Sequence, residues 1–149
     1  RLSSSSGPTS KIRWSSVTST SMVSTGKRQG SDYILNGEKM WISLASLADL
    51  ALVTVKTNPS ARKPSEGLSS FIVDLHSPGV TRGDIHGKLG VRAGSTGWIN
   101  FQDVRVPAEN RIGEEGEGFK IAMATFDRSR PTVAAQAVQR RQPQFRRGV

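Results

Sequence analysis

An Asn36-Gly37 pair between two strand-forming runs is the feature that most constrains how this chain can fold. The run Tyr33-Ile34-Leu35 precedes the pair, and Trp41-Ile42-Ser43 follows it after three further residues. Asparagine and glycine both tolerate the positive φ angles of a type I′ turn, so Asn-Gly between apolar runs is a strong hairpin signal. The sequence therefore predicts that the chain reverses direction at Asn36-Gly37.

The second of these runs carries an indole ring and, two residues later, a hydroxyl group. Because alternate residues share one face of a strand, Trp41 and Ser43 are predicted to point the same way, with Ile42 opposite. A flat apolar ring beside a hydrogen-bond donor would suit a planar heteroaromatic ligand. An aromatic residue in a strand usually belongs to the core, however, so a buried Trp41 beside a solvated Ser43 remains an alternative.

The net charge of +9 comes entirely from the two ends of the chain. All 12 acidic residues lie between Asp32 and Asp127, and residues 31–139 contain 12 basic residues, so that segment is formally neutral. Five basic residues in 1–30 and four in 140–149 supply the excess. The basic ends support an alternative function, a non-catalytic β-barrel binding module whose tails contact nucleic acid. The neutral centre lacks an aromatic and basic strand face, so we predict no nucleic-acid partner.

Composition excludes several other kinds of site. The chain has no cysteine, which excludes disulfides, thiol nucleophiles and thiolate metal ligands. His76 and His86 lie ten positions apart without clustered partner ligands, so we predict no metal site. No apolar run approaches the length of about 18 residues that a membrane-spanning helix needs.

The remaining pattern predicts a mainly β fold that ends in a helix. Short strands around Val53-Thr54-Val55, 68–75, 80–85 and 98–104 are separated by loops rich in proline and glycine, which is typical of a β-sandwich or open barrel. A helix is predicted from about Phe119, because its apolar residues recur at helical spacing. Pro131 is expected to kink or divide that helix, since it lacks a backbone donor.

Four segments follow from this pattern. Residues 1–30 are an atypical Ser/Thr-rich segment that we expect to be disordered or only partly in the barrel. Residues 31–112 form the β-domain, and 113–139 form the first helix of a truncated helical domain. Residues 140–149 are a basic tail.

The stretch Tyr33–Ser43 resembles the middle-domain signature of the acyl-CoA dehydrogenase family, Y-[VI]-[LI]-N-G-x-K-x-W-I-[ST]. Further motifs of that family follow in order, and the resemblance covers residues 31–139. These motifs are Gly67–Val73, Ser77-Pro78-Gly79-Val80, Lys88–Thr96, Phe101–Asn110, Gly116–Met123 and Phe126–Pro131. The helical part is most similar to the medium-chain and cyclic-acyl members. The resemblance implies a β-barrel or two orthogonal sheets, followed by the start of an α-helical domain.

The resemblance implies a flavoprotein that uses FAD. Such enzymes oxidise an acyl-CoA thioester to the trans-2-enoyl-CoA by removing an α-proton and transferring a β-hydride to flavin N5. At the matching positions, Trp41 would pack against the isoalloxazine ring, and the Ser43 hydroxyl would bond near N5. Ile42 would contribute backbone contacts.

The resemblance also assigns a substrate site and partners. Asp127 and Arg130 match a motif that contacts the pantetheine portion of CoA, although a surface ion pair is the alternative for them. Ser65 aligns with a serine that contacts CoA, whereas Lys88-Leu89-Gly90 and Arg92 are interpreted as turn and packing residues. Also implied are an electron-transfer flavoprotein as electron acceptor, a homotetrameric full-length enzyme, and a location in the bacterial cytoplasm or the mitochondrial matrix.

Both ends of the chain depart from the family pattern. A motif [TS]-E-P-x-x-G-S-D is expected before Tyr33, but Gly7–Ser16 contains no acidic residue. After Gln139 the family continues with a glycine and a long helix, where this chain has Arg140-Arg141-Gln142-Pro143. We therefore expect a shifted reading frame or a fragment at both ends.

No catalytic residue is predicted within this chain. The resemblance places the catalytic glutamate in a C-terminal helical region that lies outside these residues, so we expect the isolated chain to be inactive. Glu114, Glu115 and Glu117 are predicted to be a solvated loop and not a substitute base.

Overall fold

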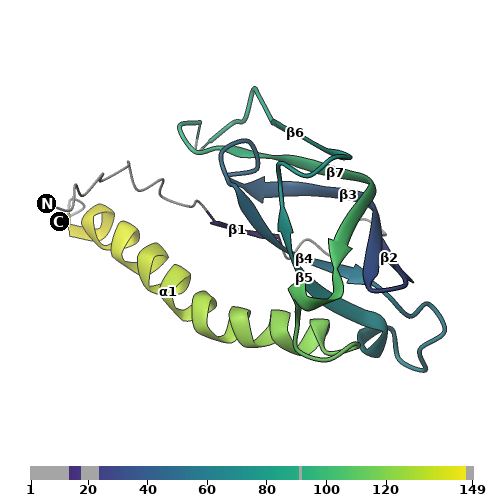
Figure 1. The fold of residues 1–149 in the computed structure, drawn as a ribbon. Helices are drawn as coiled ribbons and strands as arrows, with labels where there is room; N and C mark the ends of the chain where they lie inside the picture. Colours follow the sequence, from purple (N-terminus) through teal and green to yellow (C-terminus); the bar gives the residue numbers. More distant parts are fainter. Residues whose placement is uncertain (1–13, 18–23, 91, 147–149) are drawn as a thin grey trace, which may run out of the picture.

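The computed structural model describes residues 14–17, 24–90 and 92–146. Within these ranges, eight strands form one mixed sheet that is followed by one long helix (Figure 1). The strands are β1 (Trp14–Val17), β2 (Thr25–Gln29), β3 (Asp32–Ser43), β4 (Leu50–Lys56), β5 (Leu68–Asp74), β6 (Val80–Asp84), β7 (Thr96–Pro107) and β8 (Arg111–Ile112). The helix is α1 (Gly118–Arg146), and the 3₁₀ turns are η1 (Pro64–Gly67) and η2 (Ala108–Asn110). The mainly β prediction is confirmed.

The strands are hydrogen-bonded in the order β6-β7-β3-β2-β4-β5-β8, and β1 pairs with β4. All eight therefore belong to one continuous hydrogen-bonded sheet. Most pairs are antiparallel, whereas β1 with β4 and the single contact of β2 with β4 are parallel. The strands expected around residues 53–55, 68–75, 80–85 and 98–104 correspond to β4, β5, β6 and β7.

The predicted hairpin at Asn36-Gly37 is wrong, because β3 runs through both residues without reversing. The pairing of β3 with β7 shifts register between Leu35 and Gly37. The Asn36 amide accepts a hydrogen bond from the Asp103 N–H at 2.9 Å and donates one to the Asp103 carboxylate at 2.9 Å. Gly37 has a φ of +130°, and a Cβ there would lie 2.7 Å from Ser24 Cα. Gly37 thus supplies the positive φ that an irregularity inside the strand needs, and the Asn36 side chain bonds to Asp103 of β7 at that irregularity.

The reversal itself lies at Gly30-Ser31. Gln29 pairs with Asp32 across this two-residue loop, and Gly30 has a φ of +64°. Gly-Ser between strand-forming residues is also a recognised hairpin sequence. The signal was therefore present in the sequence, one strand earlier than Asn36-Gly37.

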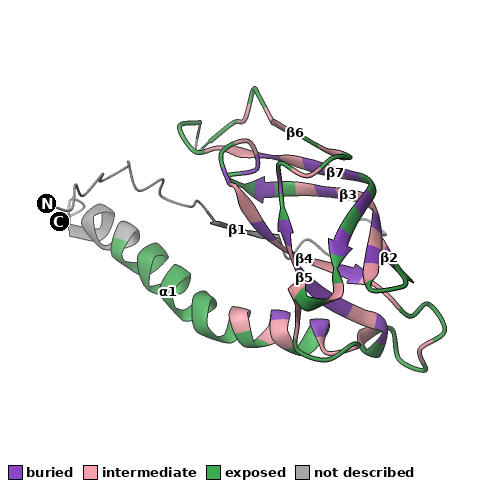
Figure 2. Ribbon diagram, in the orientation of Figure 1, coloured by how far each residue is buried: buried purple, intermediate pink, exposed green. Residues whose placement is uncertain are grey.

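The core is formed by side chains on the inward faces of β3, β4, β5 and β7 (Figure 2). Tyr33 and Phe71 are both completely buried, with ring centroids 4.7 Å apart. In β4, alternate residues Ala51, Val53 and Val55 are buried, as a strand with one covered face requires.

Helix α1 starts at Gly118 and continues without a break to Arg146. Pro131 does not divide it, and the helix includes residues 140–146 of the predicted basic tail. Residues 127–139 are all exposed, so the carbonyl that Pro131 leaves without a helical donor can bond to water. Among the residues of α1 whose burial is described, the buried and half-buried ones lie in the first turns (Figure 2). Ala122 is buried, whereas Phe119 is 42% exposed.

Part of the predicted disordered segment lies outside the described residues, namely 1–13 and 18–23, as do 147–149 of the tail. Within residues 1–30, β1 and β2 belong to the sheet. In the described part of the chain, no helix is long and apolar enough to cross a membrane.

Candidate functional site

Trp41 lies on a bulge of β3, two residues before the end of the strand at Ser43. Met40 is opposite Trp98 in β7 and Ile42 is opposite Gly97, so Trp41 has no residue opposite it. Its φ is +63°, which is uncommon for a bulky side chain. A bulge of this kind re-aims the extra side chain, and the Trp41 side chain is 67% exposed. The core alternative for this tryptophan is therefore contradicted.

The neighbouring residues alternate as the strand pattern predicts. Ile42 is buried, whereas Ser43 is exposed like Trp41. Beyond the strand, Leu44 and Leu47 are 40% and 46% exposed. We call Trp41, Ser43, Leu44 and Leu47 the Trp41 surface. It offers an indole ring and apolar side chains beside a hydroxyl, and this set of groups fits an isoalloxazine ring, which has apolar faces and a polar edge.

The predicted substrate residues lie on other elements. Ser65 is half-buried in η1, and α1 packs against η1, β4 and β5. Asp127 and Arg130 are exposed on α1. The Arg130 guanidinium lies 5.0 Å from the centroid of the Phe126 ring. Among the described residues no ion pair joins Asp127 to Arg130, so the surface ion pair considered as the alternative to a substrate contact is not formed.

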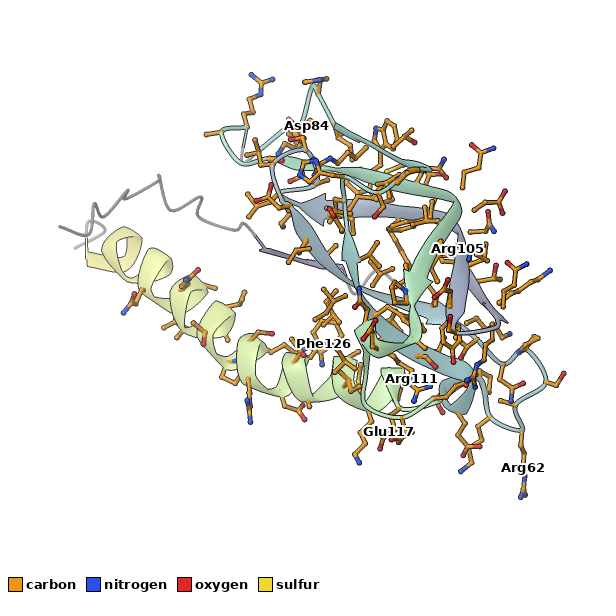
Figure 3. All side chains as sticks on the ribbon, viewed as in Figure 1. Arg62, Asp84, Arg105, Arg111, Glu117 and Phe126 are labelled. Atoms are coloured by element: carbon orange, nitrogen blue, oxygen red, sulfur yellow. The ribbon has the colours of Figure 1, made fainter. Side chains whose placement is uncertain are left out.

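The two predicted groups of site residues lie in different parts of the domain. In Figure 1 the end of β3 lies away from α1. Figure 3 shows Phe126 and Glu117 where α1 meets the strands, and Asp84 at the opposite end of the β-domain. The turn η1, which carries Ser65, therefore lies beside the start of α1. The structure does not bring Trp41, Ile42 and Ser43 beside Asp127 and Arg130.

A polar network next to the Trp41 surface was missed by the sequence analysis. The two Asp84 carboxylate oxygens accept hydrogen bonds from Ser46 and Ser95, each at 2.8 Å. The Ser95 hydroxyl, followed by the Ser46 hydroxyl, holds the pKa of Asp84 below its usual value. Arg82 donates to the Ala45 and Ala48 carbonyls. The bonded residues are far apart in the sequence: Ser46 and Asp84 are separated by 38 positions, and Ala45 and Arg82 by 37. No local sequence pattern therefore predicts the network.

Lys39 is a second feature that the sequence analysis missed. It is 4% exposed, and burial lowers the pKa of its amine to about 8. It shares the inward phase of β3 with Tyr33 and Leu35, which are also buried. That spacing was the signal that could have found it.

The loop before β7 supports the interpretation of its family motif as a turn. Lys88 donates to the Gly94 carbonyl and, at 3.1 Å, to the Thr96 hydroxyl. Arg92 donates to the Lys88 carbonyl at 2.9 Å. Leu89 is fully exposed and packs against nothing in the described part of the chain.

In the acidic segment before α1, Glu114 and Glu115 are exposed and Glu117 is half-buried, and their carboxylates have structural partners. The Tyr33 hydroxyl donates to Glu115 at 3.0 Å, and Arg111 donates to the Tyr33 hydroxyl at 3.3 Å and to Glu114 at 3.2 Å. Glu117 accepts a hydrogen bond from the Glu114 N–H at 3.0 Å, and this bond, followed by Lys120, lowers the Glu117 pKa. These contacts fasten the start of the helix to the sheet.

The two histidines are exposed, and His76 lies 3.2 Å from the Asp49 carboxylate. Among the described residues, no group of three or more histidine and acidic side chains could hold a metal ion.

Comparison with known families decides what this domain is. The model of the acyl-CoA dehydrogenase middle domain matches residues 12–104. The chain belongs to the acyl-CoA dehydrogenase family. The family is FAD-dependent, and its relatives here are mitochondrial or bacterial oxidoreductases that act on CH–CH bonds. Membership of this family replaces the alternative of a nucleic-acid-binding module.

Individual relatives agree with this assignment. The mitochondrial short-chain specific acyl-CoA dehydrogenase of Rattus norvegicus is 42% identical over 114 residues, which are 76% of this chain and 27% of that protein. The structure of butyryl-CoA dehydrogenase from Megasphaera elsdenii superposes with a TM-score of 0.77 at 37% identity, covering 83% of this chain and 34% of the other. A structure titled as the electron transferring flavoprotein of Acidaminococcus fermentans gives the same four values. The chain thus spans about a quarter to a third of the proteins it resembles.

Proposed function

We propose that this chain forms the flavin-facing β-wall of an acyl-CoA dehydrogenase that oxidises an acyl-CoA thioester to the trans-2-enoyl-CoA. The observation that carries the proposal is the bulge of β3, which exposes 67% of Trp41 beside the exposed Ser43 while Ile42 stays in the core. Leu44 and Leu47, which follow in the chain, are also exposed, and a group of exposed apolar side chains carried by an irregular backbone is typical of a binding site.

FAD would supply the hydride acceptor of this reaction when bound. The chain's own residues would bind and orient the isoalloxazine ring. Trp41 would cover one face of the isoalloxazine ring and exclude water from it. The Ser43 hydroxyl would donate a hydrogen bond near N5, worth about 1 kcal/mol net. Ile42, buried beneath, fixes the strand that carries both side chains.

The remaining parts of the proposal concern substrate and partners. Ser65, Asp127 and Arg130 would contact the pantetheine portion of CoA. The α-proton would go to a glutamate that these 149 residues do not include. We further propose a homotetramer, an electron-transfer flavoprotein as electron acceptor, and a location in the bacterial cytoplasm or the mitochondrial matrix. A similar solved structure is titled for such an electron carrier, which supports that partner.

A titration of FAD into the chain labelled with 5-fluorotryptophan tests the flavin contact. The three tryptophans, Trp14, Trp41 and Trp98, give separate ¹⁹F resonances that single Trp→Phe variants assign. We expect FAD to shift or broaden the Trp41 resonance more than that of Trp98, which lies opposite Met40 in β7. Equal shifts of all three resonances, or no shift at millimolar FAD, would contradict the proposal.

The flavin content of the purified chain tests its completeness as an enzyme. After purification from a lysate supplemented with FAD, we expect flavin absorbance to be absent or substoichiometric, and no oxidation of butyryl-CoA. Stoichiometric flavin with turnover would overturn the assignment of the base to residues outside the chain.

A further inference from the structure

Two side chains of β6 reach the segment that follows Trp41 and Ser43. Arg82 and Asp84 are alternate residues of this strand, so they share a face. Arg82 donates to the carbonyls of Ala45, at 3.4 Å, and Ala48. Asp84 accepts the Ser46 hydroxyl at 2.8 Å. Three positions of one five-residue loop, 44–48, are thus bonded to one strand.

Asp84 also joins that loop to a second one. Its other oxygen accepts the Ser95 hydroxyl at 2.8 Å, and the Ser46 and Ser95 hydroxyls are 3.3 Å apart. The Ser95 carbonyl in turn accepts the Leu44 N–H at 3.1 Å. The carboxylate therefore fixes both loops that meet at the end of β3.

The backbone between Trp41 and Leu44 needs such support. Trp41 and Leu44 have φ angles of +63° and +61°, which large side chains rarely adopt. Backbone of this kind persists only where the surrounding structure holds it. Below it, Ala45 is pressed against Gly97, where an added Cβ would lie 2.9 Å from the Ala45 Cβ.

We propose that Arg82 and Asp84 act as positioning residues, which hold the loop 44–48 and thereby fix Trp41 and Ser43 in their exposed arrangement for the flavin. We call the bonds from Arg82 and Asp84 to the loop 44–48 the clamp. Its purpose rests on the proposed function, but the clamp itself is a property of the chain without flavin. Its energetic effect appears as loss of order at Trp41 and as weaker flavin binding.

The test uses the 5-fluorotryptophan chain in four variants. Asp84→Ala removes both acceptors, and Arg82→Met removes the guanidinium donors. Asp84→Asn keeps one acceptor and one donor for the two serine hydroxyls. Asp32→Ala is the matched control, because Asp32 lies at the other end of β3 and its carboxylate bonds to Arg105 at 3.0 Å.

We expect Asp84→Ala and Arg82→Met to broaden or split the Trp41 resonance without FAD, and Asp84→Asn and Asp32→Ala to leave it sharp. The FAD concentration at half-maximal shift should rise about tenfold in the first two variants, as the loss of charge-assisted hydrogen bonds implies. The Trp98 ring lies against Gly83, so an unchanged Trp98 resonance shows that β6 has kept its place.

A Trp41 resonance in Asp84→Ala that matches the wild type would overturn the clamp. If Asp84→Ala does not fold, by circular dichroism, Ser46→Ala removes one of the two bonds from the loop side and must broaden the same resonance. A wild-type resonance that responds to these substitutions but not to FAD would overturn the proposed function and leave the clamp standing.

Discussion

Substitution of Gly37 by alanine tests the conclusion that Asn36-Gly37 lies inside a strand. The φ of +130° is open only to glycine, and forcing alanine into it costs about 1–3 kcal/mol. The new Cβ would also lie 2.7 Å from Ser24 Cα, a backbone atom that cannot rotate away, which adds about 1–3 kcal/mol of overpacking. We expect Gly37→Ala to lower the free energy of unfolding by about 3–4 kcal/mol and Tm by about 10 °C.

Gly30 provides the matched control for this prediction. It also has a positive φ, +64°, but a Cβ there would meet no atom within 4 Å. Gly30→Ala should therefore cost only about 1 kcal/mol, the strain of a left-handed residue less the gain from a stiffer unfolded chain. Urea unfolding followed by circular dichroism, with equal m-values, measures both. Equal costs for the two substitutions would refute the in-strand position of Gly37, because a solvent-exposed turn makes no such collision.

Substitutions at three further residues have defined outcomes. Tyr33→Phe removes the hydroxyl that bonds Arg111 and Glu115, and should lower the free energy of unfolding by about 1 kcal/mol in urea, with Tyr33→Leu costing more because the ring is lost. Gly97→Ala should destabilise by about 1–3 kcal/mol in thermal unfolding, since its Cβ would press on Ala45 and on the backbone of β6. Lys39 has a folded-state pKa of about 8 against an ordinary 10.5, so the unfolded chain binds more protons between these values and wild-type stability should rise from pH 8 to 10. Lys39→Met should abolish that rise in urea unfolding at the two pH values, and a wild-type stability that falls over this range would contradict the burial of the amine.

Short strand-forming runs between loops rich in proline and glycine were enough to place most strands. The runs around residues 53–55, 68–75 and 98–104 became β4, β5 and β7, and burial alternates along β4 and along most of β7. Such strands can be predicted because one face of each is covered by the same core.

The phase change within β3 could not be predicted from alternation. Tyr33, Leu35 and Lys39 point inward from odd positions, and Ile42 points inward from an even one. The bulge at Trp41 moves the alternation by one residue, and it depends on pairing with β7, more than fifty positions away. For the same reason the sequence could place Trp41 and Ser43 on one face but could not say whether that face was buried.

The Arg82–Asp84 network and the long helix show two other limits. Ser46, Asp84 and Ser95 are ordinary polar residues in three separate segments, and only the folded chain brings their oxygens together. Pro131 normally ends a helix, but its cost depends on whether the freed carbonyl is hydrated, which the sequence does not encode.

Contact between Trp41 and the isoalloxazine ring can be measured through the decay of flavin fluorescence. An indole in van der Waals contact quenches an excited flavin by electron transfer on the picosecond scale. FMN is the suitable probe, because it has no adenine that could quench its own ring. We expect a picosecond component with the wild-type chain and with Trp98→Phe, and its loss with Trp41→Leu. No such component in the wild type, or one that persists in Trp41→Leu, would contradict the claim.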